Sequence, residues 1–136
     1  MLVTSEYLQA MKTQRLMACR ELSQLRIAVV RERLLPNIQR TLDPLTVTIF
    51  GSLARGTATE DSDADVLVIA GNPASSQRWL DRQNMAQSVV AAADLPFGCD
   101  LLVWTREERD RARATKNGLL AEIEERGVVI YDPLRQ

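Results

Sequence analysis

An uninterrupted apolar run, Val66-Leu67-Val68-Ile69-Ala70, constrains the fold of this chain more than any other segment. Its length and β-branched composition are typical of a buried strand. A second short run, Val47-Thr48-Ile49-Phe50, lies upstream and ends at Gly51, where the backbone can approach a ligand without side-chain interference. These patterns predict two strands, the first of which breaks into a turn at Gly51.

Two carboxylates stand directly before the apolar run, in Asp63-Ala64-Asp65. Alternate residues of a strand share a face, so we expect both carboxylates to point the same way. Like charges held this close repel and raise a carboxylate pKa unless a cation lies between them. Mg²⁺ prefers carboxylate oxygens and completes its shell with water and substrate phosphates. The pair therefore predicts a divalent metal site.

The spacing of these residues resembles a known signature. Gly51-Ser52, ten intervening residues and Asp63-Ala64-Asp65 are similar to the motif of the DNA polymerase β-type nucleotidyltransferase superfamily. Ala54-Arg55-Gly56 and Ser62 also resemble the fuller pattern of its minimal nucleotidyltransferases. The resemblance covers residues 45–131 and implies an α/β (α+β) fold with a small mixed sheet flanked by helices.

The resemblance also implies a third carboxylate on a later strand, and Asp100 fits that place. It stands in Cys99-Asp100-Leu101-Leu102-Val103-Trp104, where a lone acid is costly to bury unless it is paired or coordinated. The family fold implies that this strand lies beside the one that starts at Asp65. Asp63, Asp65 and Asp100 are then the catalytic residues and the ligands of two Mg²⁺ ions, which suit transfer of a nucleotide from a triphosphate.

The nucleotide phosphates are assigned to the turn at residues 51–55. Gly51 and Ser52 are expected to bind them through backbone N–H groups and the Ser52 hydroxyl, and Ser52 could also cap a helix that starts at Leu53. Arg55 either adds positive charge near the leaving pyrophosphate or forms a surface ion pair with Glu60 or Asp61.

The coarse pattern predicts an N-terminal helical extension over residues 1–44 and a nucleotidyltransferase domain over residues 45–136. The helix is expected over residues 5–34, with Pro36 and Pro44 closing the stretch. We expect a turn at Gly71-Asn72-Pro73, helices over residues 76–93, 106–113 and 118–126, and a last strand over residues 128–131, with Gly127 as a cap.

A helix of about 30 residues would span about 45 Å, more than a domain of this size easily covers. Its apolar residues form two stripes rather than one. One interpretation is that the C-terminal half packs on the sheet while the start projects or bends. The other is that the excess surface binds a partner protein or a second copy.

Composition excludes several classes of function. The chain has no histidine, so a Ser-His-Asp triad and a His-liganded zinc site are excluded. Seventeen basic and eighteen acidic residues give a formal net charge of −1, which does not favour binding to nucleic acid or to an anionic membrane. Cys19 and Cys99 are too few for a disulfide framework, and no apolar segment reaches membrane-spanning length. We expect a cytoplasmic protein.

Small proteins of this form resemble the antitoxin of HEPN and minimal nucleotidyltransferase toxin–antitoxin pairs, which adds AMP from ATP to a tyrosine of the HEPN ribonuclease. That resemblance alone implies ATP, a HEPN-type toxin as partner, and assembly with it. Two alternatives stay open: a small-molecule (aminoglycoside-like) or RNA acceptor, perhaps with a homo-oligomer completing the site, and a nonenzymatic antitoxin that binds its partner. Tyr7 and Tyr131 are candidate acceptors for self-modification.

Overall fold

The computed structural model of the chain describes residues 4–71 and 78–135. Its centre is a four-stranded mixed sheet with the order β3-β2-β1-β4. β1 pairs antiparallel with both β2 and β4, whereas β2 and β3 are parallel. The strands are β1 (Pro44–Phe50), β2 (Ala64–Ala70), β3 (Cys99–Trp104) and β4 (Val128–Tyr131).

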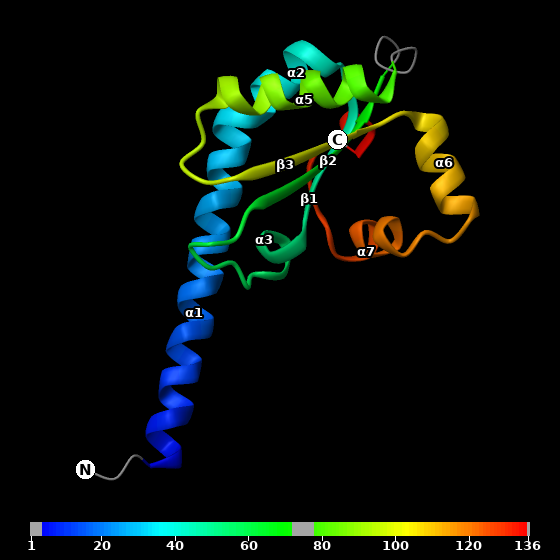
Figure 1. The fold of residues 1–136 in the computed structure, drawn as a ribbon. Coiled ribbons are helices and arrows are strands. Elements are labelled where there is room, and N and C mark those ends of the chain that lie inside the picture. The colour runs from blue at the N-terminus through cyan, green and yellow to red at the C-terminus, as the bar shows by residue number, and fades with distance from the viewer. Residues whose placement is uncertain (1–3, 72–77, 136) are drawn as a thin grey trace.

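Helices flank this sheet, as Figure 1 shows. The α/β class with a small mixed sheet is therefore confirmed, and β1 begins at Pro44, earlier than the predicted residue 47. The helical segments are α1 (Ser5–Val29), η1 (Val30–Leu34), α2 (Leu35–Leu42), α3 (Gly51–Arg55), α5 (Trp79–Ala93), α6 (Arg106–Ala114), α7 (Gly118–Arg126) and η2 (Pro133–Arg135).

The prediction that Pro36 closes the N-terminal helix is wrong. The chain stays helical to Leu42, with Pro36 in the first turn of α2. A proline inside a helix removes one hydrogen bond and clashes with the carbonyl four residues earlier. Here the preceding turn, η1, is a π-helix in which the Leu35 N–H donates to the Val30 carbonyl. This wider turn accommodates Pro36, and the helix ends at Asp43, which adopts a left-handed conformation.

Two hydrophobic cores lie on opposite faces of the sheet. Val66 and Val68 belong to the larger core, which also contains residues of η1, α2 and α5. Leu67 and Ile69 alternate with them and pack in a smaller core against α7. β2 is therefore buried on both faces, as its uninterrupted apolar run predicts.

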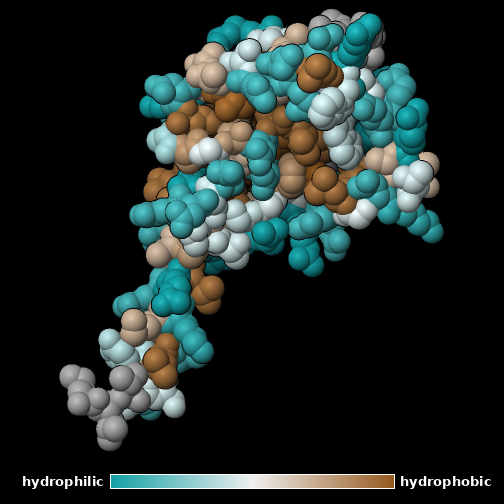
Figure 2. Space-filling model, viewed as in Figure 1, coloured by the Kyte–Doolittle hydropathy of each residue, from teal (hydrophilic) through white to brown (hydrophobic). Residues whose placement is uncertain are grey.

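The N-terminal half of α1 extends away from the domain (Figure 1). Its side chains are exposed up to residue 18, and burial starts near Ser23. Figure 2 shows this arm with hydrophobic side chains scattered among polar ones. The start of the helix projects, as one interpretation expected. Its C-terminal part packs against α3, and the following turn η1, rather than α1 itself, enters the larger core on the sheet. No helix in residues 4–71 and 78–135 is long and apolar enough to cross a membrane.

The remaining predicted elements agree closely with the structure. α5, α6, α7 and β4 lie where their patterns place them, and Gly127 follows α7 as its C-terminal cap. The predicted turn at residues 71–73 and the start of the helix predicted from residue 76 fall partly outside the described residues. Gly71 itself donates its N–H to the Asp43 carbonyl at 2.8 Å, which ties the end of β2 to the start of β1.

Candidate functional site

Gly51 joins the end of β1 to the short helix α3. Its φ of +72° lies in the left-handed region, which glycine adopts without the cost that a Cβ imposes. A Cβ at this residue would also lie 2.3 Å from Asp65 Oδ2. The sequence therefore needs glycine here for two separate reasons, and the backbone of the turn lies directly against the Asp65 carboxylate.

Asp63 and Asp65 flank the start of β2. Only Asp65 belongs to the strand, so strand alternation does not by itself orient Asp63. Asp63 lies against a second glycine: a Cβ at Gly98 would come within 2.2 Å of Asp63 Oδ1. The Ala64 N–H donates to the Gly98 carbonyl at 2.8 Å and fixes this approach. Each carboxylate is thus in close contact with a glycine backbone.

Asp100 lies beside Asp65 on the neighbouring parallel strand. The register of β2 and β3 pairs Asp65 directly with Asp100, which confirms that these strands are adjacent. The cost of burying Asp100 among apolar residues does not arise, because its side chain is exposed near the beginning of an edge strand. An exposed carboxylate at this place is accessible to a ligand that approaches from solvent.

The three carboxylates create a locally negative site. Burial, and then the charges of Asp100 and Asp63, raise the pKa of Asp65, while the positive charge of Arg55 opposes that rise. Burial and the same three carboxylates raise the pKa of the Cys99 thiol to about 12. Cys99 therefore stays protonated at neutral pH and is not a nucleophile there.

The chemistry of these donors fits Mg²⁺. In residues 4–71 and 78–135, no three His, Cys, Asp or Glu side chains already converge as a metal-binding group. Mg²⁺ does not require such a cage, because it is commonly held by one or two carboxylates together with water and substrate phosphates. The glycines at 51 and 98 leave the Asp65 and Asp63 oxygens in cradles that a Cβ would fill.

Ser52 and Arg55 lie on α3, next to the carboxylates. Ser52 is inside the helix, its carbonyl accepts the Thr57 N–H at 3.0 Å, and Phe50 occupies the cap position that was considered for Ser52. Arg55 Nη1 pairs with Glu122 of α7 at 3.1 Å, so the partner is neither Glu60 nor Asp61. This pair is partly exposed, and Arg55 still acts electrostatically on Asp65.

Two polar residues of α1 hold the loop between the glycine turn and Asp63, and the sequence interpretation missed both. Arg26 is buried and donates to the Ser62 carbonyl at 2.5 Å and to the Glu60 carbonyl at 3.1 Å. Ser23 is also buried, and its hydroxyl accepts the Ala58 N–H at 3.0 Å. The sequence signal that could have identified these two residues is their spacing, because a serine and an arginine three residues apart lie on the same face of a helix.

Arg26 makes one further contact, with its guanidinium 4.8 Å from the centre of the Phe97 ring. Phe97 precedes Gly98, the residue against which Asp63 lies. One buried side chain therefore contacts both the loop that leads into Asp63 and the segment that leads into Asp100. Such a contact positions the acids without touching them.

A cavity of about 550 Å³ adjoins the carboxylates. Asp65 and Asp100 form part of its wall, and Gln83 and Gln87 of α5 form another part. The rest is mainly apolar. The complete lining is Phe50, Asp65, Gln83, Ala86, Gln87, Val90, Ala91, Cys99, Asp100, Leu101, Leu102 and Leu119.

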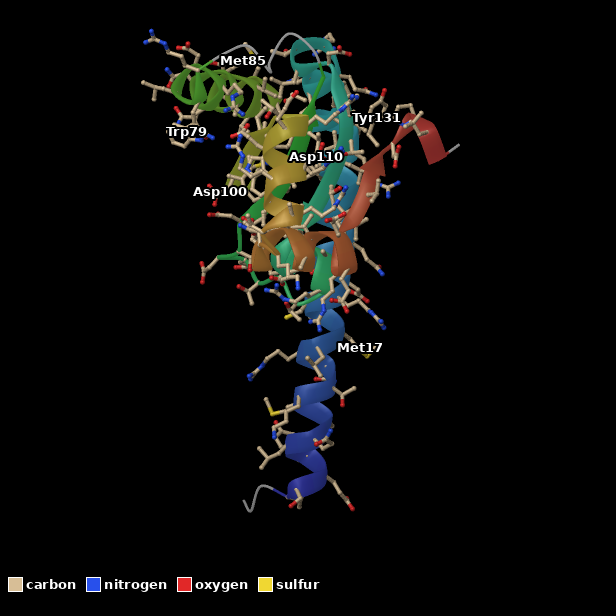
Figure 3. All side chains as sticks on the ribbon, turned by 90° about the vertical axis from the view of Figure 1, so that its right-hand side faces the viewer. Met17, Trp79, Met85, Asp100, Asp110 and Tyr131 are labelled. Carbon is tan, nitrogen blue, oxygen red and sulfur yellow. The ribbon has the colours of Figure 1, made fainter. Side chains whose placement is uncertain are left out.

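Neither tyrosine lies at this site. Tyr7 is on the projecting part of α1, and Tyr131 is on β4, at the opposite edge of the sheet from β3. Figure 3 shows Asp100 and Tyr131 on opposite sides of the domain. Modification of Tyr131 by the carboxylates of the same molecule is therefore not favoured by the fold.

A model of the nucleotidyltransferase domain family matches residues 31–130 of the chain. The chain is a nucleotidyltransferase. The match includes every carboxylate and glycine of the site described above, and the structure brings them together at one end of β2 and β3. The resemblance first seen in the spacing of Gly51, Asp63 and Asp65 is thus confirmed at the level of the family.

One curated relative of this nucleotidyltransferase is "Putative protein adenylyltransferase MJ1305" from Methanocaldococcus jannaschii. The two are 36% identical over 90 residues, which is 66% of this chain. The chain spans 60% of the relative's length.

Two solved structures share the fold of this nucleotidyltransferase. One is described as "a putative nucleotidyltransferase from Sulfolobus solfataricus", with a TM-score of 0.58 and 22% identity, covering 86% of this chain and 90% of that chain. The other is a toxin–antitoxin with AMP-PNP, with a TM-score of 0.56 and 19% identity, covering 77% of this chain and 75% of that chain. At these identities the likeness establishes the fold.

Proposed function

We propose that this nucleotidyltransferase transfers AMP from ATP to a partner protein and acts as the antitoxin of a toxin–antitoxin pair in the cytoplasm. The observation that carries the proposal is the pairing of Asp65 with Asp100 across β2 and β3, beside the glycine turn at residue 51. The relative named as a protein adenylyltransferase supports a protein acceptor. The toxin–antitoxin neighbour with AMP-PNP supports both ATP and a toxin partner.

The nucleotide is assigned to the end of the site formed by α3. Gly51 and Ser52 bind the phosphates there, and Arg55 adds positive charge near the departing pyrophosphate. Asp63 and Asp65 would hold Mg²⁺, with two ions expected, as is common for nucleotide transfer. Bound Mg²⁺ supplies the positive charge that neutralises the triphosphate.

The acceptor is assigned to the side of Asp100, whose exposed carboxylate lies on the edge strand β3 and lines the cavity, whereas the exposed Asp63 does not line it. Asp100 serves as a metal ligand on this side and accepts the proton of the acceptor hydroxyl. The acceptor oxygen forms a bond to the α-phosphorus, the bond from that phosphorus to the pyrophosphate oxygen breaks, and pyrophosphate leaves. The chain has no histidine, so a carboxylate is a reasonable proton acceptor.

The partner is proposed to be a HEPN-type ribonuclease toxin, modified on a tyrosine. This part of the proposal comes from the resemblance to the antitoxins of such pairs. The toxin–antitoxin neighbour supports a toxin in general. The antitoxin would form a hetero-oligomer with its target, at least while AMP is transferred.

The test is the intact mass of the proteins encoded beside this chain, each co-expressed with it. Wild type and the Asp61→Asn control are expected to add AMP to one of them, because Asp61 is an exposed acid outside the site. The Asp63→Asn/Asp65→Asn variant is expected to add none. If the Asp63→Asn/Asp65→Asn variant leaves its partner unmodified but still neutralises it, inhibition occurs by binding alone. That result would reject the enzymatic proposal.

A further inference from the structure

We propose that the acceptor is an extended polypeptide segment that binds between α5 and the edge strand β3, with one end at Asp100 and the other at Trp79 and Leu80. The inference rests on the proposed function, because it takes Asp100 as the acceptor side of the site. It adds the extended form of the acceptor segment and the surface that recognises it. We call this surface the α5–β3 groove: it consists of the cavity residues Gln83, Gln87, Val90, Asp100 and Leu102, together with the exposed Trp79 and Leu80 of α5, which lie outside the cavity lining.

The groove starts in the cavity beside the carboxylates. Gln83, Gln87 and Val90 of α5 line that cavity together with Asp100 and Leu102 of β3. The glutamines are four residues apart and so share one face of the helix. Their amides can donate to and accept from a peptide backbone. The cavity therefore presents polar groups to a chain whose hydroxyl reaches Asp100.

The same face of α5 continues beyond the cavity to two large exposed side chains. Trp79 lies four residues before Gln83 and Leu80 lies three residues before it, so both flank the cavity-lining face. They are 61% and 62% exposed and adjacent in sequence, so they present apolar surface next to the cavity-lining face of α5. Figure 3 shows Trp79 and Asp100 on the same side of the domain.

The length of the groove fits a peptide. Trp79 and Val90 are eleven residues apart on α5, which corresponds to about 16 Å along the helix axis. An extended segment of about five residues covers that distance. β3 is an edge strand of the described sheet. Arg82 of α5 occupies its Val103 carbonyl at 3.0 Å, so an added segment has to pair with other backbone groups of β3. Edge strands offer backbone groups to an added segment, a common mode of peptide recognition.

Charge and polarity distinguish a polypeptide from the other acceptor classes. Within the described part of the chain, the cavity lining contains two carboxylates and no lysine or arginine. A nucleic acid needs basic groups to neutralise its phosphates, so this lining disfavours RNA as the acceptor. The two carboxylates also attract the ammonium groups of an aminoglycoside, so charge alone does not separate it from a peptide. The exposed indole of Trp79 and the Leu80 side chain do, because they suit apolar side chains of a protein better than a polar polycation. These features favour a polypeptide over both alternatives.

The experiment uses the full chain with Mg²⁺ and ATP labelled in its α-phosphate. The acceptors are short peptides that each carry one tyrosine, serine or threonine, an RNA oligonucleotide, and kanamycin. Peptides are the expected acceptors. Trp79→Ala and Leu80→Ala are each expected to raise the KM for the peptide about tenfold, with KM for ATP and kcat unchanged. Leu25→Ala is the matched control, because Leu25 is 65% exposed but lies on α1, away from the groove.

Three results would overturn the inference. Labelling of RNA or kanamycin in preference to peptides would leave the nucleotidyltransferase activity intact and reject the polypeptide acceptor. Peptide labelling with the same KM in both groove variants as in Leu25→Ala would reject the groove. Labelling of no acceptor in this assay, with a protein encoded beside the chain still modified in the mass experiment, would reject the inference and leave the proposed function intact. Thermal unfolding of each variant confirms that a changed KM is not a loss of fold.

Discussion

Gly51 and Asp65 are in such close contact that a Cβ at residue 51 would lie 2.3 Å from Asp65 Oδ2. A side chain at residue 51 would therefore displace the Asp65 carboxylate from its present position. The positive φ of Gly51 adds a second constraint at the same residue. The turn that is proposed to bind the phosphates therefore packs directly against Asp65, one of the proposed metal ligands.

Replacing Gly51 with alanine should damage the site more than the same change at Gly56. Both glycines have a positive φ, +72° and +75°, which costs an alanine roughly 1–2 kcal/mol. Only Gly51 also lacks space, since no atom lies within 4 Å of a Cβ at Gly56. We expect Gly56→Ala to lower stability by that amount and keep activity, and Gly51→Ala to lose stability further and abolish AMP transfer. Equal stability and activity of the two variants would contradict this account.

Replacing Asp65 with asparagine should stabilise the metal-free protein at neutral pH while abolishing transfer. Burial, and then the charges of Asp100 and Asp63, hold the pKa of Asp65 above its ordinary value. The folded protein thus binds this proton more tightly than the unfolded chain does. The resulting stabilisation is present below the ordinary aspartate pKa and is lost as the pH rises through the folded pKa.

Thermal unfolding with and without Mg²⁺ tests this prediction. At pH 7 without divalent cations, Asp65→Asn should melt at a higher temperature than wild type, and the difference should shrink as the pH falls. Mg²⁺ should raise the Tm of wild type more than that of the variant, because the ion relieves the repulsion among the carboxylates. A lower Tm for the variant in the absence of Mg²⁺ would show that repulsion does not dominate at this site.

Replacing Arg26 with glutamine should destabilise the loop between the glycine turn and Asp63. The side chain donates to the Ser62 and Glu60 carbonyls and lies over the Phe97 ring. Loss of these contacts is expected to lower the free energy of unfolding by about 1–3 kcal/mol and to reduce kcat. Arg20→Gln, on an exposed part of the same helix, should change the free energy of unfolding by less than about 0.5 kcal/mol. Denaturant unfolding of both variants makes the comparison, and equal effects would argue against a positioning role for Arg26.

Replacing Glu108 with glutamine should lower the stability of the protein at neutral pH and make that stability fall less as the pH is lowered. Burial alone would raise the pKa of Glu108, but hydrogen bonds from Arg82 and Thr105, together with the Arg82 charge, lower it overall. Its stabilisation is then present above the ordinary glutamate pKa and is lost as the pH falls through the lower folded value. The expected loss at neutral pH is about 1–2 kcal/mol, because Glu108 is partly exposed while Arg82 is buried.

We would check this prediction by measuring unfolding between about pH 3 and pH 7, the range in which an ordinary glutamate titrates. Glu107→Gln, an exposed neighbour on α6, is the matched control and should follow wild type. If Glu108→Gln had the same acid dependence as wild type, the Arg82 pair would not be the source of that dependence.

Local patterns predicted most of the fold. Neighbouring residues alone determine the apolar runs of β2 and β3, the turn at Gly51 and the helical periodicities. The structure places those elements as expected. Pro36 was misjudged because a single π-helical turn accommodates it, and sequence gives no signal for that turn. The strand pairing of Asp65 with Asp100 came from the family resemblance, not from local pattern.

The supporting residues of the site depend on long-range contacts, which explains why they were missed. Arg26 reaches Ser62 across 36 residues of sequence, and Arg55 pairs with Glu122 across 67. Nothing near Arg55 indicates Glu122, whereas Glu60 and Asp61 are close in sequence and were the natural candidates. The close approaches of Gly98 to Asp63 and of Gly51 to Asp65 likewise appear only when the strands are assembled.

The most direct test of nucleotide transfer by these carboxylates is the transfer of label from ATP to the proteins encoded beside this chain. ATP is labelled in either the α- or the γ-phosphate, and wild type is compared with Asp100→Asn and with the exposed control Asp94→Asn. The account predicts label on the partner from the α-phosphate only, with wild type and the control but not with Asp100→Asn. Label from the γ-phosphate, or equal transfer by Asp100→Asn, would contradict it.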